Sequence, residues 1–172
     1  NYQDFLDRVD LLGTLGYPVL ISNYDTHYRL ASFFFRHTQK PIGIVMGIPT
    51  LREIFDEKYY SKLDGGILEA FGRLFKNDLR LYVYPFLEKE SSEKITLENL
   101  KVPKKLSHLY AFLMQNRNIV DIEKYNENYL KIFSRDVLGR IRKSETGWEK
   151  NLPPKVAQKI KRNKLFGYKP EK

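Results

Sequence analysis

The chain has no cysteine among its 172 residues, and none of its apolar runs approaches membrane-spanning length. The lack of cysteine excludes a disulfide framework, a zinc finger and a thiol nucleophile. A membrane-spanning helix needs roughly 18 consecutive apolar residues, so this class is excluded as well. The N-terminus also lacks the charged patch and apolar stretch of a secretory signal. We therefore predict a cytoplasmic protein without a membrane partner.

The composition is that of an ordinary folded domain. Hydrophobic residues make up 42%, aromatic residues 14% and charged residues 30% of the chain, which excludes disordered and fibrous classes. A single core grows readily to this chain length. The first residue is Asn1 and not Met, which indicates a fragment of a longer protein.

Charge is distributed unevenly along the chain. Residues 1–100 hold 12 basic and 14 acidic side chains, whereas residues 101–172 hold 18 basic and 7 acidic ones, a net charge of +11. Such asymmetry is typical of a surface for an anionic partner, and equally of a solvated helical face rich in lysine. Basic charge attracts phosphates without choosing among them. Nucleotides, nucleic acids and acidic proteins therefore all stay open as partners.

Apolar spacing predicts helices that alternate with short strands over the first hundred residues. Helical spacing covers residues 2–15, 25–38, 49–60 and 67–75. Short apolar or alternating runs predict strands at 19–21, 42–47 and 79–87, with one more short strand between 95 and 102. This alternation favours βαβ units. We predict an α/β, Rossmann-like fold with a mostly parallel sheet flanked by helices.

The remaining residues have a helical and basic pattern. Residues 150–172 alone hold eight basic side chains and one acidic side chain. We therefore predict an α/β core over 1–102 and a basic helical portion over 103–172 that packs on it, together forming one domain. Trp148 stands among lysines, which suits a base-stacking platform, although docking of a peripheral helix is the preferred interpretation.

The candidate ligand site lies where the predicted strands end. In open α/β sheets, ligands bind beyond the carboxyl ends of the strands and near helix N-termini. These ends place Ser22, Asn23 and Gly47 at one edge. Ser22 and Asn23 can donate to an anion, and Gly47 lets backbone approach a ligand closely. Because any strand-to-helix loop uses these residue types, helix capping is the alternative interpretation.

Two further glycines precede a predicted helix and suit a phosphate cradle. Gly65 and Gly66 would expose backbone amides at a helix N-terminus, with Lys58 or Arg73 supplying positive charge. Arg73 also follows Glu69 by four residues, which predicts an ordinary ion pair and is the preferred interpretation. Neither the dinucleotide-binding pattern nor the P-loop pattern of glycines occurs.

His27 falls in the first turn after a predicted strand, where a general base would face the sheet edge. A partly exposed structural histidine is the preferred alternative. The zinc-protease and α/β-hydrolase motifs do not occur. Asp56, Glu57 and Asp64 are acidic enough for magnesium, but their spacing matches no defined loop. No metal site and no catalytic residue is predicted from the residues alone.

Several stretches resemble a known family. They include residues 19–24, 57–60, 65–75, 81–85 and 165–168. Together they resemble the C-terminal region of long bacterial proteins labelled nicotinate-nucleotide adenylyltransferase, over nearly the whole chain. The resemblance implies nucleotidyl transfer from ATP to a pyridine mononucleotide, with magnesium.

The chain departs from the well-known adenylyltransferases at their catalytic motifs. The patterns G-x-F-x-P-x-H-x-G-H and I-S-S-T-x-x-R are both absent, so no catalytic residue is carried over. These motifs supply the charges that stabilise the transferring phosphoryl group. Either a missing N-terminal part of the same protein supplies them, or the label is loose.

The leading prediction is a nucleotide- or phosphate-binding α/β domain of a nicotinate-nucleotide adenylyltransferase-like protein. One alternative is a non-catalytic interaction domain that binds nucleic acid or an acidic protein through its basic C-terminal half. Another is a domain that dimerises a larger enzyme, which predicts an exposed apolar patch around Tyr59, Tyr60 or Phe166.

Overall fold

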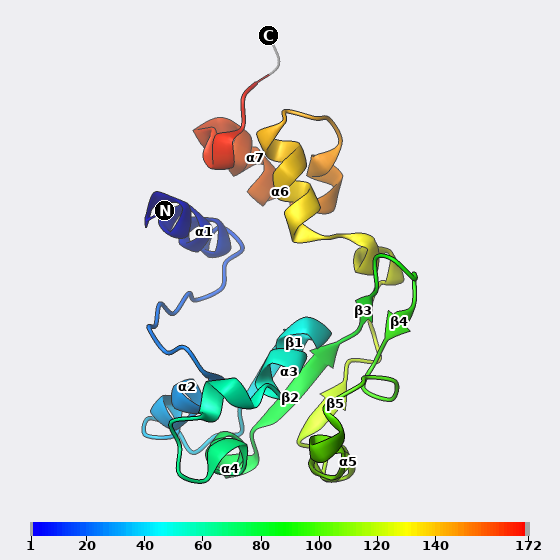
Figure 1. The fold of residues 1–172 in the computed structure, drawn as a ribbon. Helices are drawn as coiled ribbons and strands as arrows, with labels where there is room; N and C mark the ends of the chain where they lie inside the picture. Colours follow the sequence, from blue (N-terminus) through cyan, green and yellow to red (C-terminus); the bar gives the residue numbers. More distant parts are fainter. Residues whose placement is uncertain (1, 171–172) are drawn as a thin grey trace. The chain divides into compact units, whose positions relative to one another are not determined.

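The computed structural model describes residues 2–170, which divide into two compact units (Figure 1). The central unit runs from Asn23 to Tyr125. The terminal unit combines the described residues up to Ser22 with those from Asn126 onward. Each unit has a hydrophobic core of its own.

The central unit is built on three parallel strands, hydrogen-bonded in the order β1-β2-β5. They are β1 (Gly43–Gly47), β2 (Arg80–Tyr84) and β5 (Ile119–Asp121). Four helices precede or connect these strands, namely α2 (His27–Phe34), α3 (Ile48–Ile54), α4 (Gly66–Leu74) and α5 (Ser107–Gln115). The predicted α/β class, with a parallel sheet flanked by helices, is confirmed.

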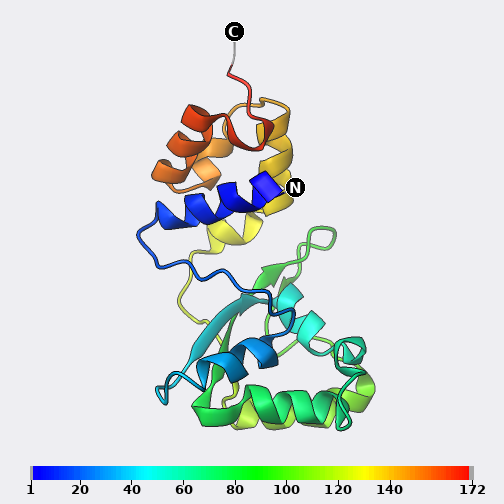
Figure 2. The same ribbon diagram turned by 90° about the vertical axis from the view of Figure 1, so that its left-hand side faces the viewer.

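The finer prediction of a Rossmann-like arrangement is not confirmed. The strand order follows the chain, so this sheet has no point at which the order reverses, and Rossmann-like folds bind their ligands at such a point. Helices α4 and α5 lie on the same side of the sheet (Figures 1 and 2). Leu81 and Val83 are fully buried, whereas Val45 on the opposite face is 69% exposed. Doubly wound sheets are covered on both faces.

The predicted strand at residues 19–21 is wrong. No strand is found there, and the side chains of Leu20 and Ile21 are 60% and 56% exposed. A short apolar run carries no periodicity that would separate a strand from a loop. Without a hydrogen-bonding partner strand, this run does not become part of a sheet.

The predicted boundary between residues 102 and 103 differs from the division seen in the structure. Strand β5, which the sequence pattern did not predict, pairs in parallel with β2 and so ties residues beyond 102 to the central unit. At the other end of the chain, Leu11 is buried in the same core as Val137 and Ile160. Pairing and packing across long sequence separations therefore set the boundary.

A two-stranded hairpin follows β2 within the central unit. Strand β3 (Phe86–Leu87) pairs antiparallel with β4 (Lys94–Ile95) around the polar loop between them. The single strand predicted over 79–87 is therefore divided at Pro85. Proline has no N–H to donate to a strand ladder, which explains the break between β2 and β3.

The terminal unit is helical, as predicted for the C-terminal residues. It contains α1 (Tyr2–Gly13), α6 (Ser134–Arg142) and α7 (Pro154–Asn163), with short 3₁₀ turns between them. Trp148 is 1% exposed and its ring makes an edge contact with Tyr168 at 5.8 Å. Docking onto the core is thus confirmed for Trp148, because a buried ring offers no stacking platform. No helix within residues 2–170 is long and apolar enough to cross a membrane.

Candidate functional site

The first predicted corner, at Ser22 and Asn23, is not formed. Both residues are exposed and follow no strand. They cap no helix either, because the N-cap of α2 is Thr26, whose side chain makes no capping hydrogen bond. The correction follows from the loss of the strand at 19–21, which the corner required.

Gly47 lies where the sequence predicted it, at the carboxyl end of β1. It pairs in register with Tyr84 and is the N-cap of α3. Its φ of −93° is open to any residue, and an added Cβ would meet only Pro49 Cδ at 3.5 Å, an ordinary contact. The structure therefore shows no close approach that requires glycine at this position.

The predicted phosphate cradle at Gly65 and Gly66 is occupied by a side chain of the protein itself. The Gly65 N–H donates to Glu69 Oε2 at 2.9 Å, and the Gly66 N–H donates to the Leu63 carbonyl oxygen at 3.0 Å. Arg73 Nη2 donates to Glu69 Oε1 at 2.5 Å. The preferred ion pair of Glu69 with Arg73 is thus present. Both amides and the guanidinium already have partners, so the cradle is closed to an external phosphate.

Lys58 is exposed and makes local contacts. Its Nζ lies 2.5 Å from Asp56 Oδ2 and 4.8 Å from the centre of the Tyr59 ring. The hydrogen bond with Asp56 raises the pKa of the Lys58 ammonium, so this residue is charged at neutral pH. Asp56 also accepts the Lys58 N–H at 3.1 Å, which starts the 3₁₀ turn Glu57–Tyr60.

His27 is the predicted site residue that the structure places in a cavity. The imidazole is half-buried at the start of α2, in a space of about 160 Å³. The other lining residues come from the segment before α2, the end of α3 and the following 3₁₀ turn: Asp25, Thr26, Glu53, Ile54, Tyr59 and Tyr60. Three segments that are separate in sequence thus meet around one imidazole.

The electrostatics of this cavity favour a neutral imidazole. Burial lowers the pKa of His27 below its usual 6.5, and the Glu53 carboxylate opposes this shift only in part. Tyr60 donates its hydroxyl to the Ile54 carbonyl oxygen at 2.8 Å, and burial raises its pKa to about 12. The cavity therefore presents a neutral imidazole at neutral pH, beside the carboxyl groups of Asp25 and Glu53 and the hydroxyl groups of Tyr59 and Tyr60. These groups suit the hydroxyl and amino groups of a ligand.

Two cations stand beside the cavity although neither lines it. Arg29 Nη1 lies 3.1 Å from Asp25 Oδ1, and Lys58 Nζ lies above the Tyr59 ring. Asp25 and Tyr59 are both lining residues. Positive charge is therefore present near the lining residues at two exposed positions.

Sequence reasoning missed one polar cluster at the end of the sheet. Asp121 closes β5, and its Oδ1 accepts the Leu97 N–H at 3.2 Å. The Tyr110 hydroxyl donates to the Leu97 carbonyl oxygen at 2.7 Å. Burial raises the pKa of the Asp121 carboxyl. The aspartate that ends the run Ile119-Val120-Asp121 was the available signal. Its role is to hold the segment after β4 against the sheet.

The aromatic patch expected of a dimerisation domain is incomplete. Tyr60 is buried, and Phe166 is half-buried against the core of the terminal unit. Only Tyr59 of the three predicted residues is exposed. The dimerisation alternative therefore stays a prediction.

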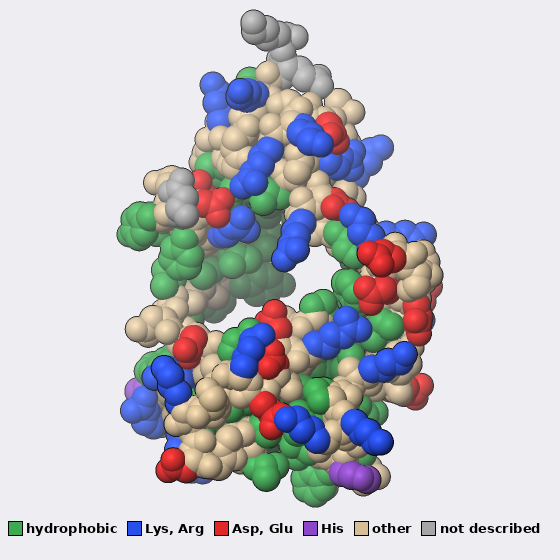
Figure 3. Space-filling view, viewed as in Figure 1, with side chains coloured by type: hydrophobic (Ala, Val, Ile, Leu, Met, Phe, Trp, Pro, Cys, Tyr) green, Lys and Arg blue, Asp and Glu red, His purple; other side chains and the backbone are tan. Residues whose placement is uncertain are grey.

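The basic residues are divided between the two units. The terminal unit carries 14 basic and 8 acidic side chains in the sequence, a net charge of +6, and the central unit carries a net charge of +3. On the face drawn in Figure 3, Lys and Arg side chains are spread widely and Asp and Glu stand among them. One local concentration lies on α7, where Lys155, Lys159 and Arg162 line a single hollow.

Within residues 2–170, no three His, Asp or Glu side chains come together in a group that could hold a metal ion. Magnesium in nucleotide sites is usually held by one or two carboxylates together with the phosphates of the substrate, so the magnesium that the resemblance implies stays a prediction. Comparison of the chain with protein-family models, curated proteins and solved structures found no match. The resemblance noted in the sequence accordingly stays a prediction.

Proposed function

We propose that the central unit is a nucleotide-binding domain whose cavity beside His27 holds the sugar or the base of the ligand. The observation that carries this proposal is the meeting of a neutral, half-buried imidazole with Glu53 and Tyr59 in one cavity. Carboxylates accept hydrogen bonds from ribose hydroxyls. The exposed Tyr59 ring offers a flat face on which a base can stack.

The size and charge of the cavity indicate which part of the ligand it holds and which part stays outside. Pockets for whole drug-sized ligands measure about 300–1,000 Å³, so a cavity of about 160 Å³ takes one ring. No Lys or Arg lines it, and its two carboxylates repel phosphate. We therefore expect the phosphates to remain outside, where Arg29 and Lys58 contact lining residues.

The proposal concerns binding, and no catalytic step is derived for this chain. The resemblance to nicotinate-nucleotide adenylyltransferases supports the choice of ATP and nicotinate mononucleotide as ligands. Adenylyl transfer needs positive charges preorganised around the reacting phosphate. The described residues show no such arrangement in the cavity, whose lining lacks Lys and Arg.

Calorimetry with ATP, nicotinate mononucleotide, NAD and adenosine tests the proposal, with magnesium present and absent. We expect His27→Ala to reduce the affinity for every ligand by about tenfold, because it removes a hydrogen-bonding group from the cavity. Lys58→Gln should weaken the nucleotides and leave adenosine unchanged. The matched control is His108→Ala, an exposed histidine on α5. Absence of heat with all four ligands, or equal binding by His27→Ala and the unaltered protein, would overturn the proposal.

A second candidate function rests on the basic hollow of α7. Lys155, Lys159 and Arg162 follow the spacing of one helix face, and Thr14, Gln158 and Lys161 complete the lining. Such a stripe suits the phosphates of nucleic acid. Three neutralised phosphates predict a log–log salt slope of about −3 for generic duplex DNA.

Replacement of these three cations by alanine should reduce binding and flatten the salt slope. The control is the triple variant Lys101→Ala, Lys104→Ala, Lys124→Ala, which removes the same charge from exposed positions of the central unit. Equal losses in the two triple variants would show that net charge alone attracts the nucleic acid, and would overturn this candidate.

A further inference from the structure

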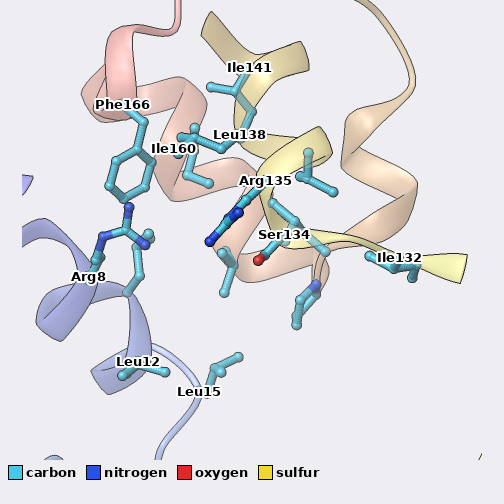
Figure 4. A pocket seen from close by; sticks show the side chains of 15 residues that line it. Arg8, Leu12, Leu15, Ile132, Ser134, Arg135, Leu138, Ile141, Ile160 and Phe166 are labelled. Carbon is cyan, nitrogen blue, oxygen red and sulfur yellow. The ribbon is translucent and has the colours of Figure 1, made fainter. Parts of the chain in front are cut away.

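The terminal unit contains an open, mainly apolar groove that the proposed functions do not use. It measures about 620 Å³ and lies between α1, α6 and α7 (Figure 4). Its wall consists largely of aliphatic and aromatic side chains, among them Leu12, Leu15, Leu138, Ile160 and Phe166. This volume falls within the range of about 300–1,000 Å³ that is typical of small-molecule sites.

The groove leaves apolar surface of α1 in contact with water. Leu12 is 53% exposed and Leu15 is 36% exposed, although both line the groove. On the opposite wall, Ile160 and Ile141 are buried in the core of the terminal unit. An apolar ligand would remove the two leucines from water without displacing the core beneath them.

The charged groups of the lining are both cationic. They are Arg8 and Arg135, and no Asp or Glu is among the lining residues. Arg8 is already engaged, since its Nε lies 2.8 Å from Asp4 Oδ2 and its guanidinium stands 5.2 Å from the centre of the Phe166 ring. Asp4 therefore balances the charge of Arg8, whereas no acidic side chain among the lining residues balances that of Arg135.

Of the two lining arginines, Arg135 is the one whose guanidinium has no ion-pair partner among the described residues. Its side chain makes no hydrogen bond or ion pair with any of residues 2–170. Figure 4 shows its guanidinium directed into the space between α6 and α1, with the Ser134 hydroxyl beside it. An unpaired guanidinium next to apolar walls is suited to a carboxylate, which it can bind through two parallel hydrogen bonds.

We propose that this groove binds one molecule of an amphipathic carboxylate of the fatty-acid class. The carboxylate pairs with Arg135, and the Ser134 hydroxyl donates a further hydrogen bond. The alkyl chain lies against Leu12, Leu15 and Ile160. A nucleotide fits this lining poorly, because its many polar groups would meet only three polar side chains, Arg8, Arg135 and Ser134.

Binding of three matched probes to the whole chain tests the proposal. Dodecanoate, dodecanol and dodecylammonium have the same alkyl chain and differ in head group, and they are titrated below their micelle-forming concentrations by calorimetry. We expect dodecanoate to bind most tightly and dodecylammonium least. Equal affinity for the carboxylate and the ammonium, or no binding of dodecanoate, would overturn the proposal. So would binding to anionic lipid vesicles without binding of monomeric dodecanoate.

Two variants and one control locate the site. Arg135→Gln should reduce the affinity for dodecanoate by about tenfold and leave the affinity for dodecanol unchanged, since it removes a charge-assisted contact. Leu12→Gln should weaken the binding of both probes. Because Leu12 is exposed, this substitution should leave the fold intact. Arg162→Gln is the control, because it removes the same charge from a hollow outside the groove. A loss with Arg162→Gln as large as that with Arg135→Gln would contradict the assignment.

Discussion

At the scale of single residues, local pairs decide which predicted groups stay available to a ligand. Glu69 uses the Gly65 amide and the Arg73 guanidinium together. Lys58 keeps an exposed position in contact with Asp56 and Tyr59. His27 lines a cavity. Residue type predicts what a group is able to bind, whereas its neighbours determine what it has already bound.

Two glycines seven residues apart, one at the N-cap of α4 and one inside it, should respond oppositely to alanine. A Cβ on Gly65 would lie 2.8 Å from Glu69 Cβ, whereas a Cβ on Gly72 inside α4 meets nothing within 4 Å. We expect Gly65→Ala to destabilise by about 1–3 kcal/mol through overpacking. Gly72→Ala should stabilise by about 0.5–1 kcal/mol through reduced backbone entropy. Urea denaturation measures both, and equal effects of the two would contradict the close contact.

The lowered pKa of His27 makes stability depend on pH in a defined direction. The unfolded chain binds a proton near pH 6.5, while the folded state binds it only at lower pH. Stability should therefore be fully present above pH 6.5 and decline as pH falls through the folded pKa. His27→Gln should reduce this decline between pH 8 and pH 5 in thermal unfolding. An imidazole pKa above 6.5 by NMR titration would show that the sign is wrong.

At the scale of elements, apolar runs with similar sequence patterns adopt different structures. The run at 19–21 is exposed, whereas the run at 43–47 forms β1 and pairs with β2. The difference lies in the presence of a hydrogen-bonding neighbour, which periodicity does not encode. Helices were more readily predicted, because their apolar spacing is local and repeats over several turns.

Truncation of one leucine side chain in the loop and one in a core strand should change the free energy of unfolding by different amounts. Leu20→Ala should change the free energy of unfolding by less than about 0.5 kcal/mol, as is usual for surface positions. Leu81→Ala should cost about 2–5 kcal/mol, because Leu81 is completely buried in β2. Urea denaturation compares the two variants. A large loss from Leu20→Ala would show that residues 19–21 are packed in a core.

At the scale of the whole molecule, the chain forms two cores that share no buried residue. One core surrounds the parallel sheet and includes Leu81. The other joins α1 to the C-terminal helices through Leu11 and Trp148. The two proposed ligand sites fall in different units, with the His27 cavity in one and the Arg135 groove in the other.

Removal of the Trp148 side chain should therefore destabilise the core of the terminal unit and leave the core of the central unit intact. Trp148→Ala removes a side chain that is 1% exposed and should destabilise the terminal unit by about 3–5 kcal/mol. In hydrogen exchange, amides of α6 and α7 should lose protection while amides of β1 and β2 retain theirs. Equal loss of protection in both sets would contradict the separation of the cores.

The sequence by itself determined the α/β class, most helices, the presence of strands within 42–47 and 79–87, and the ion pair of Glu69 with Arg73. These features follow from local periodicity and from pairs four residues apart, which a single strip of sequence contains. Tertiary structure alone decided the pairing of β5, the exposure of residues 19–21, the union of α1 with the C-terminal helices and both cavities. Each of these depends on groups that lie far apart in sequence, so the free energy that selects them arises only when the chain brings them together.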